Sequence, residues 1–131
     1  MYNEPFKYPG PLLLLVGRLS RQKGFDYLLK SLDKLTLDEP RLRIIIVAVP
    51  SSWELDFLKT LLEMVLSYPD NLRVLPGMLN RVDLAPLYYA ANATLIPSRS
   101  EPFGLVALES MASGTLVAAS RTGGLSTLSR M

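Results

Sequence analysis

Two short segments of the sequence combine charged side chains with glycine in a spacing that suits anion chemistry. The first reads Gly17-Arg18-Leu19-Ser20-Arg21-Gln22-Lys23-Gly24; it follows an apolar run and precedes an amphipathic one. Backbone N–H groups and the positive dipole end at a helix N-terminus favour an anion there. Arg18 adds a forked donor and Lys23 a point charge, a pair that suits a diphosphate. Because the segment has neither a Walker ending nor a Gly-x-Gly-x-x-Gly pattern, two solvated cations beside a turn remain the alternative.

The second segment reads Pro97-Ser98-Arg99-Ser100-Glu101-Pro102-Phe103-Gly104 and leads into an apolar helix. Pro102 suits a first helical position, and Gly104 allows a ligand to approach the backbone closely. The amide groups of residues 103–106 would lie in the first helical turn and could face an anion or sugar oxygens. The spacing therefore predicts a second anion-facing loop.

Two carboxylates belong to this second region, and each has a purely structural alternative. Glu109 is the single charged residue among apolar neighbours in the helix, and such a side chain could simply point to solvent. Glu101 could form a capping box with Ser98, although Pro102 makes that register awkward. The local pattern alone leaves both alternatives open.

Short apolar runs precede both segments and predict the elements that position them. We expect strands over 12–16 (ended by Gly17), 42–49, 72–75, 93–96 and 116–119. They alternate with helices around 25–35, 52–65, 84–92 and 104–112. The second helix opens with a capping box, Ser51 as N-cap and Glu54 at N3, and the last ends with Gly114 at C′. This alternation predicts an α/β fold with a doubly wound, Rossmann-like, mainly parallel sheet and helices on both faces. Ligands bind such sheets at the carboxyl ends of the strands, where loops 17–24 and 97–103 begin.

The composition narrows the available chemistry. The 131 residues include 14 Lys and Arg against 12 Asp and Glu, and neither His nor Cys. Thiolate nucleophiles, disulfides and histidine bases are therefore excluded within this chain. The basic residues are scattered, so we expect no nucleic-acid partner, and the apolar runs are too short for a membrane span. A single domain in the cytoplasm is the expectation.

Taken together, the two segments resemble the donor-binding, C-terminal domain of retaining GT-B glycosyltransferases of the glycogen/starch synthase, sucrose synthase and sucrose-phosphate synthase type. The matching residues are Gly17-Arg18-Leu19-Ser20-x-x-Lys23-Gly24 and Pro97-Ser98-x-x-Glu101-Pro102-Phe103-Gly104-Leu105-Val106-x-x-Glu109-x-Met111-Ala112-x-Gly114. The resemblance covers the chain from Leu12 to about Leu125, in order and spacing. It makes the surface alternatives for both segments much weaker.

The resemblance implies a role for each matching residue. Arg18 and Lys23 would hold the diphosphate of a nucleotide sugar such as UDP-glucose or ADP-glucose and stabilise the leaving group, while catalytic Glu101 would face the transferred sugar. Glu109 would accept hydrogen bonds from the ribose hydroxyls. The remaining nucleotide-sugar contacts would come from Gly17, Phe103, Gly104, Leu105, Val106, Gly123 and Gly124. No metal and no cofactor is expected, because arginine and lysine neutralise the diphosphate.

The sequence also departs from the family pattern. Val47-Ala48-Val49-Pro50 stands where the family usually has a glycine-containing turn, Leu116 where proline is common, and Ser126-Thr127 where Pro-Glu is usual. The last of these differences, Ser126-Thr127, puts a donor-side contact in doubt. Residues 1–131 would form a single, partial nucleotide-sugar-binding domain, without the acceptor-binding domain that supplies further catalytic groups, including a histidine.

The resemblance thus implies transfer of a hexosyl group, with glucosyl favoured, to a sugar or glycan acceptor. The chain alone is expected to be inactive without an N-terminal acceptor domain or a separate acceptor-binding subunit. One alternative is a non-catalytic nucleotide- or sugar-binding module, or a partner subunit, derived from the same fold. Another is an unrelated doubly wound module, such as a flavodoxin-like or signalling domain. The Glu-x₇-Glu spacing of Glu101 and Glu109 argues against the latter.

Overall fold

The structure, a computed structural model, describes Phe6 and residues 9–18, 25–49, 55–76, 81–96 and 105–119. Strands and helices alternate in the order β1 (Leu12–Arg18), α1 (Phe25–Asp38), β2 (Arg43–Val49), α2 (Leu55–Ser67), β3 (Leu72–Pro76), α3 (Arg81–Ala90), β4 (Ala93–Ile96), α4 (Leu105–Ala112) and β5 (Leu116–Ala119). Each strand and helix expected from the sequence is present, so the alternation is confirmed.

The strands form one parallel sheet in the order β3-β2-β1-β4-β5. From β1 the chain winds outward through β2 to β3 and then returns to the other side of β1 to begin β4. This reversal of direction beside β1 defines a doubly wound sheet and its topological switch point. The predicted Rossmann-like fold class is therefore confirmed.

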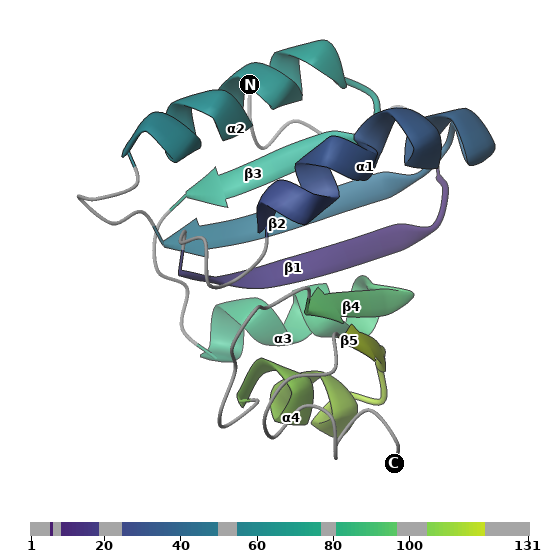
Figure 1. Cartoon of the computed structure of the whole chain (residues 1–131). Helices are drawn as coiled ribbons and strands as arrows, with labels where there is room; N and C mark the ends of the chain where they lie inside the picture. Colours follow the sequence, from purple (N-terminus) through teal and green to yellow (C-terminus); the bar gives the residue numbers. More distant parts are fainter. Residues whose placement is uncertain are drawn as a thin grey trace.

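Helices cover both faces of the sheet, α1 and α2 on one and α3 and α4 on the other (Figure 1). Under α1 and α2 lies the larger core, which includes Leu15, Leu32, Ile44, Ile46 and Leu61, all without solvent exposure. The other face has a core around Leu14 and Tyr88 below α3 and a smaller one around Ile96 below α4. Burial from both sides explains why the strands read as continuous apolar runs.

Several element boundaries differ from the expected ones. β1 does not end at Gly17, because Gly17 pairs with Ala48 and Arg18 with Val49 along β2. Backbone pairing with a long neighbouring strand thus extends β1 past the end of its apolar run. The first two residues of the predicted 17–24 loop therefore belong to the strand.

Helix α3 begins at Arg81 rather than at Leu84 and ends at Ala90 rather than at Asn92. Asp83 in its first turn complements the positive end of the helix dipole. At the other end, Asn92 is committed to β1: its Oδ1 accepts from the Leu12 amide and its own amide donates to the Leu12 carbonyl, both at 2.8 Å. This double link explains why the helix stops before Asn92.

Two arginines near the amino ends of β2 and β3 bind the N-terminal segment. The Arg73 guanidinium lies 4.8 Å from the centre of the Phe6 ring and donates to the carbonyls of Pro69 and Leu72. Arg43 Nε donates to the Gly10 carbonyl at 2.8 Å. Because these contacts lie at the edge opposite the strands' carboxyl ends, both arginines have a structural role away from the predicted ligand edge.

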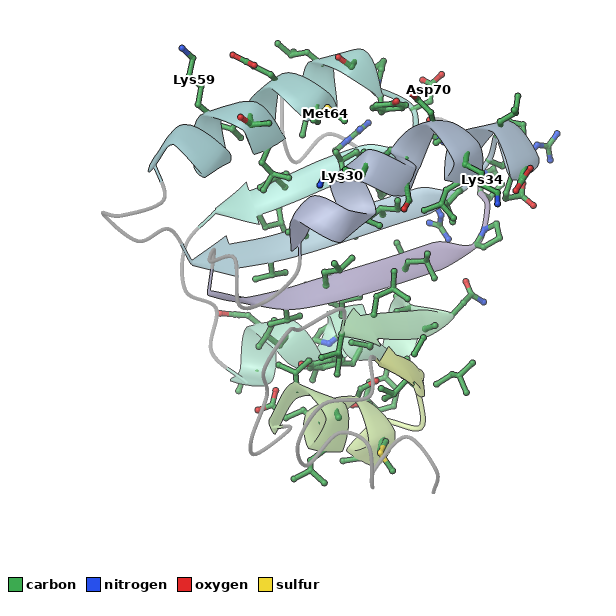
Figure 2. All side chains as sticks on the ribbon, in the orientation of Figure 1. Lys30, Lys34, Lys59, Met64 and Asp70 are labelled. Atoms are coloured by element: carbon green, nitrogen blue, oxygen red, sulfur yellow. The ribbon has the colours of Figure 1, made fainter. Side chains whose placement is uncertain are left out.

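The outward faces of α1 and α2 carry charged side chains, including the exposed Lys30, Lys34 and Lys59 (Figure 2). These positions alternate with the buried leucines that face the sheet, as amphipathic helices require. Among the helices that the structure describes, none has the length and apolar character needed to cross a membrane.

Helix α4 ends in a Schellman motif, as the Gly114 prediction required. Gly114 has a φ of 76°, its amide donates to the Met111 carbonyl at 3.0 Å, and the Thr115 amide donates to the Ser110 carbonyl at 3.0 Å. This compact ending turns the chain directly into β5.

Replacing Gly114 with alanine is expected to lower the free energy of unfolding by about 1 kcal/mol, because an L-residue is strained in the left-handed region. A Cβ at Gly114 would meet no heavy atom within 4 Å, so the cost is conformational and not steric. Urea titration followed by circular dichroism measures it. Gly114→Asn is the matched control and should lose less, because asparagine tolerates this conformation. Equal stability of the alanine variant and the parent chain would contradict the assignment.

Candidate functional site

The two predicted anion loops leave neighbouring strands at the switch point. β1 and β4 pair in parallel, with Leu13 opposite Ala93 and Leu14 opposite Thr94. Two residues further along this register, Val16 is level with Ile96, the last residue of β4. β1 continues for two more residues, to Arg18, so both strands end at the edge where doubly wound sheets bind ligands.

The structure places part of the predicted residue set. Gly17 and the backbone of Arg18 lie at the carboxyl end of β1, and Leu105 is the first residue of α4. The Arg18 and Leu105 side chains fall outside the described part of the chain, as do these predicted residues: Lys23, Glu101, Phe103, Gly104, Gly123 and Gly124. Their roles stay predictions.

Val106 is the first residue of α4 whose side chain is described. It is half-buried and packs against the apolar clusters under both α3 and α4. The backbone contact with a ligand that is expected for residues 103–106 stays a prediction.

Glu109 lies in α4, four residues after the helix begins, which is about 6 Å along the axis. Its side chain is half-buried, and its Oε2 accepts a hydrogen bond of 3.2 Å from the Tyr88 hydroxyl of α3. The alternative in which Glu109 simply points to solvent is therefore wrong. The carboxylate is held between the two helices that cover one face of the sheet.

Tyr88 is a residue of this site that the sequence analysis missed. It is 2% exposed, and its ring packs in the core with Leu14 and Leu84. Burial, the charge of Glu109 and the hydrogen bond to it raise the pKa of the Tyr88 hydroxyl above its usual value, so Tyr88 is the donor in this pair. A signal was available: Leu84, Tyr88 and Ala91 share one helical face, and a buried tyrosine hydroxyl needs a partner.

Buried hydroxyl groups beside Glu109 hold α4 against β4 and α3. Ser110 Oγ donates to Thr94 Oγ1 at 2.8 Å and lies 3.3 Å from the Thr115 carbonyl oxygen. Thr115 Oγ1 in turn donates to the backbone carbonyl of Tyr88. Three hydroxyl side chains buried to 8% exposure or less thus connect α3, β4 and α4 around the Glu109 position.

The described residues contain no group of three acidic side chains arranged to hold a metal ion. The predicted diphosphate ligands, Arg18 and Lys23, carry positive charge. The expectation that donor binding needs no metal stays a prediction.

The chain belongs to the family of glycosyl transferases group 1, whose sequence profile matches residues 3–130. It is 40% identical over 122 residues to a D-inositol 3-phosphate glycosyltransferase of Streptosporangium roseum; the match covers 88% of this chain and 28% of that enzyme. The chain thus spans less than a third of the length of this relative. The parallel sheet with helices on both faces is the Rossmann-like fold of GT-B glycosyltransferase domains.

Two solved structures share this fold at moderate sequence identity. Sucrose-phosphate synthase of Thermosynechococcus elongatus is 34% identical, with a TM-score of 0.74 over 95% of this chain and 31% of that one. Anabaena HepE, crystallised with UDP-glucose, is 26% identical, with a TM-score of 0.74 over 88% of this chain and 31% of that one. The sucrose-phosphate synthase match confirms the resemblance to that group at the level of fold and family.

Proposed function

We propose that this chain is the nucleotide-sugar-binding domain of a retaining glycosyltransferase that transfers a hexosyl group, with glucosyl favoured. The observation that carries the proposal is the placement of Glu109. Glu109 lies on α4, the helix that follows β4, and it accepts a hydrogen bond from Tyr88 of α3. β4 in turn pairs with β1, the strand that ends in Gly17 and Arg18. A carboxylate suited to ribose thus lies on the helix that follows β4, and a cation suited to a diphosphate ends β1, the strand paired with β4 at the switch point.

The proposed residues match the charges that develop in glycosyl transfer. The bond between the anomeric carbon and the diphosphate oxygen breaks, and its electron pair leaves with the diphosphate. Arg18, Lys23 and the N-terminus of α4 would stabilise that negative charge, while Glu101 would face the oxocarbenium-like sugar. The new bond forms between the anomeric carbon and an acceptor hydroxyl oxygen. The proton of that hydroxyl passes to the released nucleoside diphosphate. In this proposal no metal takes part.

The acceptor would bind to a part of the protein outside this chain. The chain spans 28% of the Streptosporangium enzyme, whose name specifies D-inositol 3-phosphate, and 31% of a sucrose-phosphate synthase. These two names support a small polyhydroxylated acceptor that carries a phosphate, a sugar phosphate or an inositol phosphate, beside the broader class of sugars and glycans. Without its acceptor domain the chain should bind donor but not turn it over. A cytoplasmic location remains part of the proposal.

Calorimetry with UDP, ADP, GDP and their glucose conjugates tests donor binding by the chain itself. At least one of the six should bind with a dissociation constant below 1 mM, roughly the affinity that a few charged hydrogen bonds provide. HepE, which was crystallised with UDP-glucose, makes the uridine pair the first to test. No binding of any of the six at millimolar concentration would overturn the proposal.

Arg18→Ala should weaken the tightest-binding nucleoside diphosphate about 10-fold, because it removes charge-assisted hydrogen bonds to the diphosphate. Arg41→Ala is the matched control: Arg41 is exposed and lies between α1 and β2, at the amino edge of the sheet. Its loss should change the affinity less than twofold. Equal affinities for the Arg18 and Arg41 variants would refute the diphosphate role of Arg18.

A further inference from the structure

Tyr88 contacts Glu109 from a different helix and from inside the core. Its hydroxyl reaches Glu109 Oε2 at 3.2 Å, while the ring is 2% exposed among apolar side chains of β1 and α3. A tyrosine in such a site cannot move its hydroxyl without disturbing the packing around the ring. Tyr88 therefore offers the carboxylate a rigid hydrogen-bond donor.

Further hydrogen bonds anchor both ends of this contact. On the Tyr88 side, the backbone carbonyl accepts a hydrogen bond from Thr115 Oγ1. On the Glu109 side, the next residue, Ser110, is fully buried and donates to Thr94 Oγ1 at 2.8 Å. Two residues of α3 and α4 that are 21 positions apart in the sequence are thus fixed relative to each other. The distance between hydroxyl and carboxylate follows from the packing of the two helices.

The Tyr88 hydroxyl takes up only part of the capacity of the Glu109 carboxylate to accept hydrogen bonds. A carboxylate offers about four lone-pair sites on its two oxygens, and the Tyr88 hydroxyl takes one of them at Oε2. A glutamate side chain loses rotamer freedom when a ligand orders it. A carboxylate already ordered by a buried donor has less of this freedom to lose, so it binds a ligand hydroxyl more tightly.

We infer that Tyr88 is a positioning residue, which holds the Glu109 carboxylate in the orientation that receives the ribose hydroxyls of the nucleotide. The inference rests on the proposed function, because it takes Glu109 to be the ribose ligand. Tyr88 itself lies in the core and does not contact the donor. Its effect on binding passes through Glu109 alone.

Tyr88→Phe tests this role, because phenylalanine keeps the ring and removes only the hydroxyl. The probe is UDP, ADP or GDP, whichever binds most tightly, compared with its 2′,3′-dideoxy analogue. Tyr88→Phe should weaken the ribonucleotide 3- to 10-fold and the dideoxy analogue less than twofold. In a chain that already carries Glu109→Gln, Tyr88→Phe should change neither affinity more than twofold. Such coupling is what a residue acting through Glu109 must show.

Tyr89→Phe is the matched control. Tyr89 is the adjacent residue in α3 but is 72% exposed, so losing its hydroxyl should leave both affinities within twofold. The chemical shift of the Tyr88 ¹³Cζ nucleus adds a readout without ligand: it should move in Glu109→Gln, whereas that of Tyr89 should not. Circular dichroism verifies the fold of each variant.

The outcomes separate this inference from the proposed function. If Glu109→Gln weakens the ribonucleotide but Tyr88→Phe behaves like Tyr89→Phe, positioning by Tyr88 is overturned and donor binding stands. If Tyr88→Phe weakens the ribonucleotide and the dideoxy analogue equally, Tyr88 only supports the fold, and the inference is again overturned. If none of the three nucleoside diphosphates binds, the proposed function fails and the inference fails with it.

Discussion

Replacing Glu109 with glutamine is expected to weaken nucleoside diphosphate binding about 10- to 100-fold while pyrophosphate affinity stays within twofold. Hydrogen bonds to a charged group contribute roughly 1.5–3 kcal/mol, and each 1.4 kcal/mol is a factor of ten in affinity. Glutamine has nearly the same size and removes the negative charge, so the packing between α3 and α4 should survive. Because pyrophosphate has no ribose, its binding reports only on the predicted diphosphate ligands Arg18 and Lys23.

Calorimetry with both ligands and circular dichroism of each variant measure this effect. Glu63→Gln is a suitable control, because Glu63 lies exposed on α2, on the opposite face of the sheet. It removes one carboxylate charge without touching the α3–α4 pair and should change neither affinity. An equal loss of nucleotide and pyrophosphate binding in Glu109→Gln would mean that the substitution acts on the whole site and not on the ribose.

Replacing Leu15 with alanine should lower the free energy of unfolding by about 2–5 kcal/mol. Leu15 has no solvent exposure and lies in the central strand β1, inside the core under α1 and α2. Truncation removes apolar contacts and leaves a cavity that the surrounding β-sheet cannot fill. A domain of this size has about 5–15 kcal/mol of stability in total, so the variant should lose a large fraction of it.

Urea titration of the variant and its control provides the measurement. Leu37→Ala is the control, because Leu37 lies at the end of α1 with 80% of its surface exposed. This variant should lower the free energy of unfolding by no more than about 0.5 kcal/mol. A loss below 1 kcal/mol for Leu15→Ala would show that the core tolerates the change and that β1 is not its centre. The position matters for the site, since Leu15 precedes Gly17 by two residues in the strand that ends at Arg18.

Local patterns predicted the elements well where one physical cause dominates. Runs such as 12–16 and 42–49 are apolar because both faces of a parallel strand are buried, so the periodicity alone identified the strands. Gly114 was predicted at C′ because few other residues adopt a positive φ, and its value of 76° agrees. β1 extends two residues beyond the end of its apolar run at Val16. The pairing of Arg18 with Val49 is a contact with another strand, so the local sequence does not indicate it.

The candidate site likewise combines features that local patterns predict with features that depend on contacts between distant segments. Residue type and short-range spacing were enough to predict the fold class, the helices and strands, and the candidate residues. The tertiary structure alone sets β4 beside β1, so that the strands preceding the two candidate loops are neighbours. It also decided that the Tyr88 hydroxyl meets Glu109 across 21 residues of sequence. Strand order and helix packing are set by burial summed over the whole chain, and no local segment encodes that sum.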